Sequence, residues 1–547
     1  MPTDEIGDAR RHRADAVRVE RGMTRRQALQ TAGAAALGLA AASSLPACDD
    51  ERPGEQVVIV GAGIAGLHCA YRLKKLGIRA HVFDAQKRAG GRMFTDRTTF
   101  ANGQHCELGG ELIDTGHLTM LGLAEELGIE LYDYLDDAPL RPLTAFIDGN
   151  LLSDIQILDE FSALTDSIDA ALATFANPDK IPSYADANGA ASLDQLSIAA
   201  WLDSIGASGA VRKLLEVAYT TEYGLPIDQS NALNFLILIS TNLDRFEIFG
   251  ASDERFHTKT GNDTFITELQ KRLAGQISVQ SALVAIKPRS AGGYFLTFFK
   301  DDRYVEVRAD HVVLAIPFTM LRMVDLSALP LKPQKKRAIA ELGYGTNAKL
   351  MTGYTSRPWR TLGFNGESFS TLPYQCTWDT SRLQPGASGI LTNFTGGAQG
   401  LAVGMGTPAM QAATFLDQID QVYAGTKVAH DGKVVRMHWP TNGWVKGSYA
   451  SYLVGQYTAF SGAEGEKGGP GLYFCGEHTS LVAQGYMEGG AETGARAAEE
   501  VGAALGLRPP LTEAVRAGLT IPPWKLRRML RRPGPLAVRL TQPPTRR

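Results

Sequence analysis

The sequence is poor in cysteine and lacks the spacings that hold metal ions. It has five cysteines in 547 residues, and none lies in a C-x-x-C pair or in a Cys/His pattern typical of zinc sites. We therefore predict no metal site, and we expect every cysteine except Cys48 to be an unpaired, mostly buried thiol. No Ser-His-Asp pattern or carboxylate pair stands out as a catalytic group either.

The chain also lacks a strong net charge, which is −3, but its charge is unevenly distributed. Residues 508–547 carry ten Lys/Arg and one Glu, and residues 1–47 carry seven Arg and five Asp/Glu. The body between them is therefore acidic. An acidic body argues against nucleic acid as a partner and mildly attracts cationic small molecules. The length allows two or more domains and a large core.

The N-terminal segment resembles a bacterial export signal. Arg25 and Arg26 precede a weakly apolar run at 31–44, which is too short to span a bilayer as a mature helix. A twin-arginine pair before such a run is typical of a Tat signal, here over residues 1–47. We therefore expect an exported protein of the periplasm or cell envelope. A disordered, Ala-rich extension is the alternative.

A lipid anchor and the start of translation are two open points in this segment. The sequence Leu-Pro-Ala-Cys at 45–48 resembles a lipoprotein cleavage box, in which Cys48 would become the lipidated first residue, although Pro46 fits that box poorly. Met1 and Met23 are both consistent with the start of translation, because residues 1–22 resemble no part of a signal.

A glycine turn between two apolar runs organises the rest of the chain. Residues 56–60 are typical of a buried strand and precede the sequence GAGIAG at 61–66. Residues 67–76 place apolar side chains on one helical face, and 78–83 form a second strand that ends at Asp84. Together they form a βαβ unit with the G-x-G-x-x-G fingerprint of dinucleotide-binding folds.

Each part of this fingerprint has a physical role in binding an ADP-containing cofactor. Gly61 allows a tight turn, Gly63 lets the backbone approach a pyrophosphate at the helix N-terminus, and Gly66 lets helix and strand pack closely. Asp84 can accept hydrogen bonds from both ribose hydroxyls. The cofactor-binding residues predicted in this unit are Gly61, Gly63, Ala65, Gly66, Asp84 and Ala85.

Two further glycine-rich segments follow the unit. The segment RAGGR at 88–92 can offer N–H groups and positive charge to the pyrophosphate, which a plain nicotinamide-binding domain does not need. The pair Gly109-Gly110 allows the backbone to lie against a flat ring, although alone it would indicate a turn. The cofactor contacts predicted here are Arg88, Gly91, Arg92, Gly109, Gly110, Glu111 and Leu112.

With these motifs the chain resembles the flavin-containing amine oxidases, a family of monoamine, polyamine and L-amino-acid oxidases. The resemblance covers most of residues 55–501, is strongest in the N-terminal part and in a closing motif at 471–491, and is closest to monoamine oxidase. It implies an α/β fold, with a Rossmann-like FAD-binding domain and a discontinuous α+β substrate domain. The implied segments are 55–114, 255–330 and 455–505 for the first, 115–254 and 331–454 for the second, and 506–547 for a basic, Pro-rich tail.

The resemblance implies FAD as the cofactor and adds residues to its site. Val284 would contact the adenine, Lys349 would hold a water against flavin N5, and the helix beginning near Met487 would direct its N-terminus at the flavin. Ser448 stands where monoamine oxidases have the cysteine bound to the flavin, so we predict non-covalent FAD. The other contacts implied in the closing motif are Gly476, Glu477 and Tyr486.

The resemblance also implies the reaction. A neutral amine would give up hydride from its α-carbon to flavin N5, the iminium would hydrolyse, and O₂ or another acceptor would reoxidise the flavin, giving H₂O₂ in the case of O₂. Tyr449 and Tyr486 match an aromatic cage that orients the amine without an anion that would keep it protonated.

Three positions bear on the substrate. Leu112 stands where amino-acid oxidases carry the arginine that binds the substrate carboxylate. Tyr486 stands where those enzymes often carry a tryptophan. Both differences favour amines over α-amino acids as substrates. Asp114 either faces a second cationic group on the substrate or caps the following helix. An L-amino-acid oxidase with its arginine elsewhere, or an FAD-loaded electron-relay or binding protein, are the alternatives. The particular amine, the electron acceptor and the oligomeric state have no readable signal.

Several elements are predicted from periodicity. We expect a helix that begins at 117 and stops at Gly128, largely helical structure over 153–243, and one strand over 277–286. The basic piece at 524–532 could lie on an anionic membrane near a lipid anchor, or could equally be a solvated arm or a strip on the acidic body.

Overall fold

The computed structural model describes residues 56–244 and 246–507, and every structural statement below concerns these residues. The predicted export signal, with Cys48, and the basic tail from residue 508 lie outside them. None of the described helices has the length and apolarity needed to cross a membrane.

A five-stranded parallel sheet gathers strands from distant parts of the chain in the order β19-β13-β1-β2-β9. Strands β1 and β13 are buried throughout, which is expected when helices cover both faces of a parallel sheet. The strands are β1 (Val57–Val60), β2 (Ala80–Phe83), β9 (Ile277–Ser278), β13 (His311–Leu314) and β19 (Leu472–Phe474).

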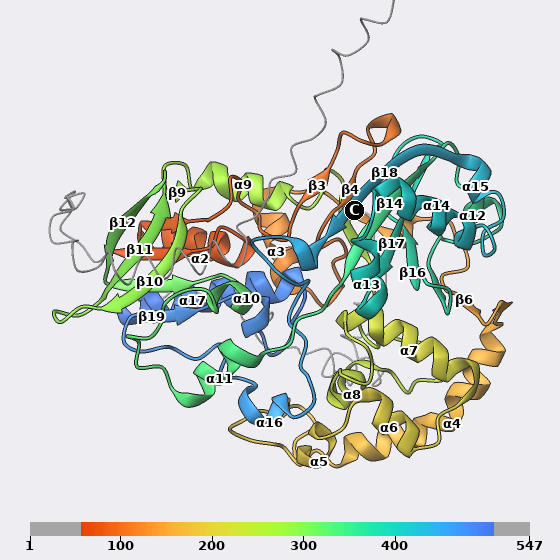
Figure 1. Cartoon of the computed structure of the whole chain (residues 1–547), viewed down its shortest axis with the longest axis horizontal. Coiled ribbons are helices and arrows are strands. Elements are labelled where there is room, and N and C mark those ends of the chain that lie inside the picture. The colour runs from red at the N-terminus through yellow and green to blue at the C-terminus, as the bar shows by residue number, and fades with distance from the viewer. Residues whose placement is uncertain (1–55, 245, 508–547) are drawn as a thin grey trace, which may run out of the picture. The chain divides into compact units, whose positions relative to one another are not determined.

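Four helices share a core with this sheet (Figure 1). They are α2 (Ile64–Lys75), α3 (Leu118–Leu127), α9 (Thr264–Arg272) and α17 (Met487–Ala504). The strand–glycine turn–helix order of β1 and α2 matches the predicted βαβ unit. The predicted α/β class with a Rossmann-like parallel sheet is therefore confirmed.

The single strand expected over 277–286 is wrong. The chain instead forms two strands in different sheets, β9 in the parallel sheet and β10 (Ala282–Pro288) in an antiparallel sheet. Between them Gln280 adopts a left-handed conformation with φ 54°, and the Ser281 N–H donates to Asp84 O at 2.8 Å. This turn redirects the chain, so that β10 pairs with β11 (Tyr294–Lys300), which in turn pairs with β12 (Arg303–Ala309).

A second, mixed sheet has the order β18-β14-β17-β16-β15-β6-β7 and is antiparallel except for the pair β15–β6. It corresponds to the substrate-side α+β region. Its strands are β6 (Thr144–Ile147), β7 (Asn150–Leu151), β14 (Ala348–Tyr354), β15 (Ser368–Ser370), β16 (Cys376–Asp379), β17 (Gly389–Thr395) and β18 (His430–His438).

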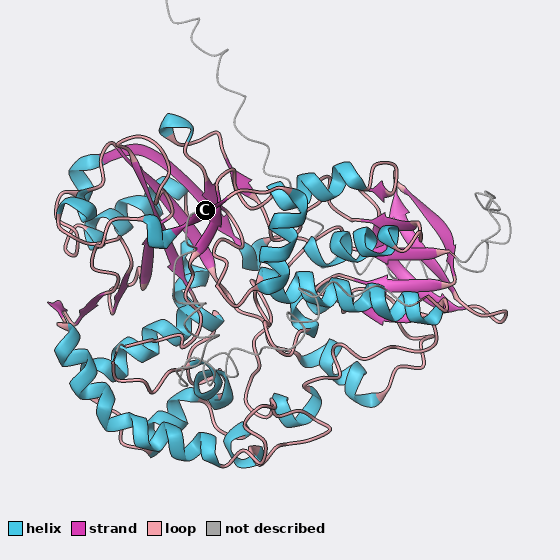
Figure 2. Cartoon of the chain, turned by 180° about the vertical axis from the view of Figure 1, so that it is seen from behind, coloured by secondary structure: helices cyan, strands magenta, loops and turns pink. Residues whose placement is uncertain are grey.

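The stretch expected to be helical forms an all-helical region (Figures 1 and 2). A capping box between Ser153 and Gln156 starts its longest helix, and the apolar positions that predicted it are buried, among them Phe161 and Leu164. The helices are α4 (Asp154–Ala173), α5 (Ala191–Asp194), α6 (Ile198–Ser204), α7 (Gly209–Tyr223) and α8 (Ala232–Leu238).

Short elements connect these parts. The helices are α10 (Phe318–Leu321), α11 (Pro333–Glu341), α12 (Pro358–Thr361), α13 (Gly397–Val403), α14 (Pro408–Ile419), α15 (Thr426–Ala429) and α16 (Gln456–Phe460). Two small antiparallel pairs join β3 (Thr95–Asp96) with β4 (Cys106–Glu107) and β5 (Leu131–Asp133) with β8 (Phe256–Thr258). The four described cysteines, Cys69, Cys106, Cys376 and Cys475, are free and buried, as predicted.

Helix α3 begins within one residue of its predicted start and ends as predicted, but its N-terminus is capped differently. Gly128 terminates it in a left-handed conformation with φ 71°. The interpretation of Asp114 as its cap is wrong, because no side chain at the helix start makes that bond. Glu488 of α17 accepts the N–H groups of Thr119 and Met120 instead, at 2.9 and 2.8 Å, which ties the start of α3 to the first turn of α17.

Candidate active site

The fingerprint glycines differ in the space around them. A Cβ on Gly66 would lie 1.9 Å from Gly61 O, and one on Gly61 would lie 2.5 Å from Ala315 O, in a backbone with φ 109°. Both positions therefore require glycine. A Cβ on Gly63 would meet nothing within 4 Å. Gly63 is the N-cap of α2 and has no side-chain cap, so the helix N-terminus faces open space where the pyrophosphate is predicted.

The second glycine segment lies directly against the first. Gly63 and Gly90 form a parallel bridge, and the Gly90 N–H donates to Ala62 O at 2.8 Å. Arg88 does not reach outward: its guanidinium donates to Gly91 O at 2.7 Å and lies 4.0 Å from the Phe94 ring centroid. Arg88 therefore braces its own loop instead of facing the predicted pyrophosphate site.

Glu477 joins three predicted segments that are far apart in the sequence. Its carboxylate accepts from Arg92 Nη1 at 2.7 Å, from the Gly485 N–H at 2.9 Å and from the Ala450 N–H at 3.3 Å. Arg92 also donates to Ser448 O at 2.8 Å. Glu477 is buried, so this ion pair fixes the first glycine-rich segment against the closing motif.

The N-terminal turns of α2 and α17 pack against each other. A Cβ on Gly490 would lie 2.8 Å from Ile64 Cγ2, and one on Gly494 would lie 2.3 Å from Ala65 O. Because both glycines are needed for this contact, the two helix N-termini lie close together. Neither is capped by a side chain. Two uncapped N-termini in one place provide positive electrostatic potential for an anionic group.

The adenosine end of the predicted site centres on Asp84. Its carboxylate accepts the N–H groups of Ala62 at 2.7 Å and Gln86 at 2.8 Å, and burial raises its pKa. Asp84 therefore also stabilises the glycine turn. Val284 lies in β10, which begins beside Asp84, and Ala85 is half-buried next to it.

Lys349 lies at the start of β14 and is buried. Its ammonium donates to Glu111 Oε2 at 2.7 Å, to Gly109 O at 2.8 Å and to Glu107 O at 3.2 Å. Burial alone would raise the pKa of Glu111, but the Lys349 charge brings it below the usual value. All three Lys349 protons are engaged, so holding a water as predicted requires it to share one of these bonds.

Two residues that the sequence did not reveal complete the environment of Glu111. Trp378 Nε1 donates to Glu111 Oε1 at 2.8 Å, and the Thr380 hydroxyl donates to the same oxygen. Lys349 Nζ lies 5.1 Å from the Trp378 ring centroid, within cation–π range. Their separation of more than 260 residues from Glu111 leaves no local pattern to find them by.

Gly110 packs directly against Met487, the first residue of α17. A Cβ on Gly110 would lie 2.7 Å from Met487 Cγ, so only glycine allows this approach. Asn262 donates to Gly110 O at 3.0 Å and to Glu111 O at 2.6 Å. Leu112, which follows, is half-buried.

Tyr449 and Tyr486 come together on one residue, Glu222. The Tyr449 hydroxyl donates to the backbone oxygen of Glu222, and the Tyr486 hydroxyl donates to its carboxyl Oε1 at 2.8 Å. The expectation of a cage without a nearby anion is therefore wrong. Burial raises the pKa of Glu222 to about 7, so this carboxyl changes its charge near neutral pH. Glu222 lies in the last turn of α7, where helical periodicity gave no signal for it.

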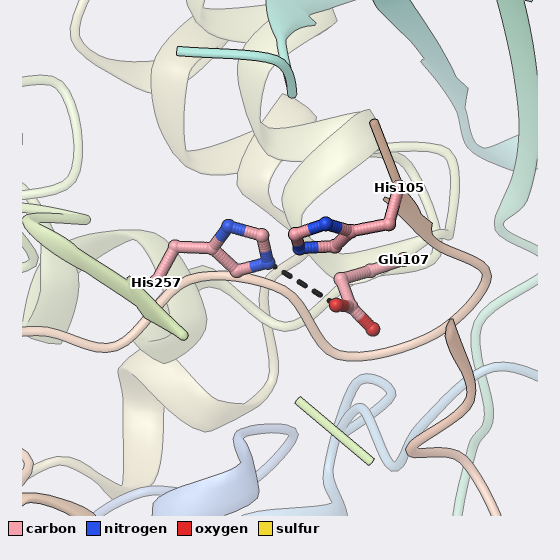
Figure 3. A group of neighbouring side chains, drawn as sticks. All are labelled: His105, Glu107 and His257. Carbon is pink, nitrogen blue, oxygen red and sulfur yellow. Dashed lines mark hydrogen bonds and ion pairs between the residues drawn. The ribbon is translucent and has the colours of Figure 1, made fainter. Parts of the chain in front are cut away.

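His105, Glu107 and His257 form a buried group of three side chains (Figure 3). His257 Nε2 is 3.1 Å from Glu107 Oε1, and the rings of His105 and His257 have centroids 5.4 Å apart. One potential metal-ligand atom from each of His105, Glu107 and His257 lies within 4.8 Å of the other two. Glu107 also accepts the Asn262 N–H and the Thr95 hydroxyl, each at 2.9 Å. This hydrogen-bonded group fixes Glu107, whose backbone oxygen bonds Lys349.

Comparisons with known proteins agree with this geometry. The family model for flavin-containing amine oxidoreductases matches residues 64–502. Flavin-containing amine oxidase B of Sus scrofa is 24% identical over 489 residues, covering 83% of this chain and 87% of that protein. Putrescine oxidase of Kocuria rosea is 25% identical over 477 residues, covering 81% and 94%.

A solved structure shows the same fold. Cyclohexylamine oxidase from Brevibacterium oxydans has a TM-score of 0.71 and 22% identity, covering 83% of this chain and all of that one. The family match begins at the first residue of α2, so it leaves out β1 and the first two fingerprint glycines but covers every other strand of the two sheets and the later glycine-rich segments. This chain therefore belongs to the family of flavin-containing amine oxidoreductases, enzymes that use a flavin, a small amine and an electron acceptor.

Proposed function

We propose that this enzyme binds FAD non-covalently and catalyses the oxidative deamination of a primary or secondary amine, with O₂ as the acceptor. The observation that supports this most strongly is that Tyr449 and Tyr486 both bond Glu222. The residues next to the two tyrosines, Ala450 and Gly485, are both held by Glu477. Tyrosine rings attract a nitrogen and can orient its α-carbon. The pair is held in the same unit as the glycine segments.

The residues present fit FAD. The uncapped N-termini of α2 and α17 and the open space at Gly63 suit a pyrophosphate. Asp84 and Val284 would hold the adenosine, and Gly109, Gly110, Lys349 and Met487 would surround the ring. When bound, the flavin accepts a hydride from the amine α-carbon and passes the electrons to O₂, giving H₂O₂, while the iminium product hydrolyses to a carbonyl compound.

The non-covalent attachment rests on Ser448. Its hydroxyl donates to Asn347 Oδ1 at 2.6 Å and is buried, and serine lacks the thiol needed for a thioether. Acid precipitation of the holoenzyme should therefore release all the flavin into the supernatant. Flavin that stays with the protein pellet would contradict this part of the proposal.

An amine is favoured over an α-amino acid by charge. The carboxyls of Asp114, Glu222 and Glu254 interact electrostatically near the tyrosine pair, and they would repel a substrate carboxylate. Arg92, which was predicted to contact the cofactor, is engaged by Glu477. No arginine among the described residues forms an ion pair with Asp114, Glu222 or Glu254.

One experiment separates the candidate functions. The purified holoenzyme is mixed anaerobically with a panel of amines and with their α-carboxylated counterparts, and flavin bleaching is recorded, followed by H₂O₂ release in air. We expect bleaching by amines and stoichiometric H₂O₂. Bleaching by amino acids alone would favour an L-amino-acid oxidase, and no bleaching with any amine would favour an electron-relay or binding protein.

We also propose that the enzyme is exported by its twin-arginine segment. That route carries folded proteins, so the cofactor would be loaded in the cytoplasm. Replacing Arg25 and Arg26 together by lysine should retain the protein in the cytoplasm, and unchanged export would refute the idea. Membrane association through Cys48 or the basic tail is a separate proposal; removing residues 507–547 without changing membrane partitioning would exclude the tail.

A further inference from the structure

Two histidines and a glutamate converge in the interior of the protein, apart from the residues assigned to the flavin and the amine. Glu107 and His257 are fully buried, and His105 is 4% exposed. His257 Nε2 lies 3.1 Å from Glu107 Oε1. Glu107 ends β4 and His257 lies in the middle of β8, 150 positions later in the sequence. The fold therefore brings together three side chains that are all able to bind a metal ion.

The nitrogen atoms of the two rings are only partly satisfied by the protein. His105 Nε2 is buried and makes no hydrogen bond to the described residues. In Figure 3 the nitrogen at the far end of the His105 ring points toward His257 and the Glu107 carboxylate. His257 Nδ1 also lacks a partner among these residues, so its ring can carry the proton there and present Nε2 as a lone pair. A buried polar atom without a partner is costly, and a cation bound by both Nε2 atoms would remove that cost for His105.

The charge of Glu107 has no lysine or arginine as an ion-pair partner in the described part of the chain. It pairs there only with His257. Its oxygens also accept the Asn262 N–H and the Thr95 hydroxyl, each at 2.9 Å. These three donors leave one of the carboxylate's roughly four lone-pair sites unused. A divalent cation would occupy such sites and compensate a buried negative charge.

The ligand set and its spacing indicate which cation fits. Two imidazoles and one carboxylate suit Zn²⁺, whereas Mg²⁺ and Ca²⁺ prefer oxygen ligands alone. Zinc bonds of about 2.0–2.2 Å place tetrahedral ligand atoms about 3.3–3.6 Å apart, close to the 3.1 Å between His257 Nε2 and Glu107 Oε1. Because the other pairs lie within 4.8 Å, binding would close them by at most about 1.5 Å.

We propose that His105, Glu107 and His257 bind one Zn²⁺ ion, which fastens β4 to β8. With three protein ligands rather than four, the ion should be removable by a chelator without unfolding the chain. The inference does not depend on the proposed oxidase function. The prediction of no metal site rested on local Cys/His spacing, which cannot detect ligands 150 positions apart.

The position of this site also suggests what the ion would do. The Glu107 backbone oxygen accepts from Lys349 at 3.2 Å. Asn262 donates its N–H to the Glu107 carboxylate and its side-chain amide to Gly110 O at 3.0 Å. An ion on Glu107 would therefore fix the strand that leads into the glycine pair of the predicted flavin site, which is a structural role rather than a catalytic one.

The first test measures the metal content of the purified holoenzyme. The protein, freed of any affinity tag, is equilibrated with ZnCl₂, passed through a gel-filtration column and analysed by inductively coupled plasma mass spectrometry. We expect about one zinc ion per chain. In His105→Gln and in His257→Gln the content should fall at least about tenfold. His81→Gln, which replaces an exposed histidine on β2, is the matched control and should keep the wild-type content.

A second test uses the wild-type protein and needs no variant to fold. X-ray absorption at the zinc edge should show nitrogen and oxygen ligands at about 2.0–2.2 Å, with imidazole scattering and no sulfur. Removing the ion with dipicolinate should lower the melting temperature, and ZnCl₂ should restore it. Less than about a tenth of a zinc ion per chain, or equal zinc in wild type and both histidine variants, would overturn the site and leave a hydrogen-bonded group. None of these measurements involves amine oxidation, so failure of the oxidase proposal would not change them.

Discussion

At the scale of single residues, Lys349 and Glu111 form the most tightly held ion pair of the site. Replacing Glu111 by Gln would leave the Lys349 ammonium buried without its counter-charge. Breaking a buried pair in this way costs about 3–5 kcal/mol. We expect Glu111→Gln to lower the free energy of unfolding by that order in urea titrations, and Lys349→Met in the same chain to recover part of it. An unchanged urea midpoint would contradict the buried pair.

The same pair predicts a dependence on pH. The folded pKa of Glu111 lies below its usual value of 4.5. Its contribution to stability is therefore fully present above the unfolded pKa and is lost as the pH falls through the folded one. The stability difference between wild type and Glu111→Gln should be constant near neutral pH and shrink below about pH 4.5, as urea midpoints measured across this range would show.

The two glycines at the start of α2 should respond differently to one added methyl group. Gly66→Ala would place a Cβ 1.9 Å from Gly61 O, and we expect it not to fold. Gly63→Ala meets no atom and has an ordinary φ of −75°, so it should fold with near wild-type stability and lose flavin affinity. Thermal melts and flavin titration of the two variants check this contrast. Equal flavin affinity in Gly63→Ala would exclude the predicted backbone approach.

Glu222 should make the activity of the enzyme depend on pH near neutrality. Its pKa of about 7 means that it gains negative charge as the pH rises through that value. We expect the pH profile of kcat/KM for an amine substrate to show a step in this range, because this carboxyl accepts the Tyr486 hydroxyl beside the proposed amine site. Glu222→Gln should abolish this step, and a step that persists in the variant would assign it to another group.

At the scale of elements, the Arg92–Glu477 pair joins loops that the two sheets cannot align by themselves. Glu477→Gln should lower the melting temperature and the flavin content together, because it loosens the glycine segment at 88–92 and the start of α17 at once. The control is Glu216→Gln, which removes an exposed partner of Arg212 and should cost at most about 1 kcal/mol. Equal effects of the two variants would contradict the special role of Glu477.

Elements with a strong local pattern could be predicted from the sequence. The apolar spacing of α4, the left-handed stop at Gly128 and the glycine turn before α2 all lie within a few residues of their own signal. The strand over 277–286 failed because its break depends on contacts with Asp84 and Gln86, about 200 residues earlier. The spacing of apolar residues within one segment carries no information about contacts with residues so far away in the sequence.

The chemistry of the site divides in the same way. Lys349, Tyr449 and Tyr486 stand in recognisable motifs and could be named before the fold was known. Glu222 and Thr380 could not, because each acquires its role only from partners brought to it by the fold.

At the scale of the whole described body, the flavin should act as a structural component. Segments from both ends of the chain meet at the two uncapped helix N-termini, and a ligand that binds only the folded form stabilises it by mass action, about 4 kcal/mol at a thousandfold excess over Kd. We expect removal of the flavin to lower the melting temperature clearly and re-addition of FAD to restore it. An unchanged melting temperature would place the cofactor elsewhere.

Strand β19 lies at the edge of the parallel sheet, and its late place in the sequence also determines when folding of the protein can finish. Strand β19 pairs with β13, and α17 packs on α2 through Gly490 and Gly494. The first nucleotide-binding unit to leave the ribosome must therefore wait for residues synthesised some 400 positions later. A nascent chain halted before residue 472 should be unable to retain a flavin, so maturation, and any transport of the loaded enzyme, must follow the release of the finished polypeptide.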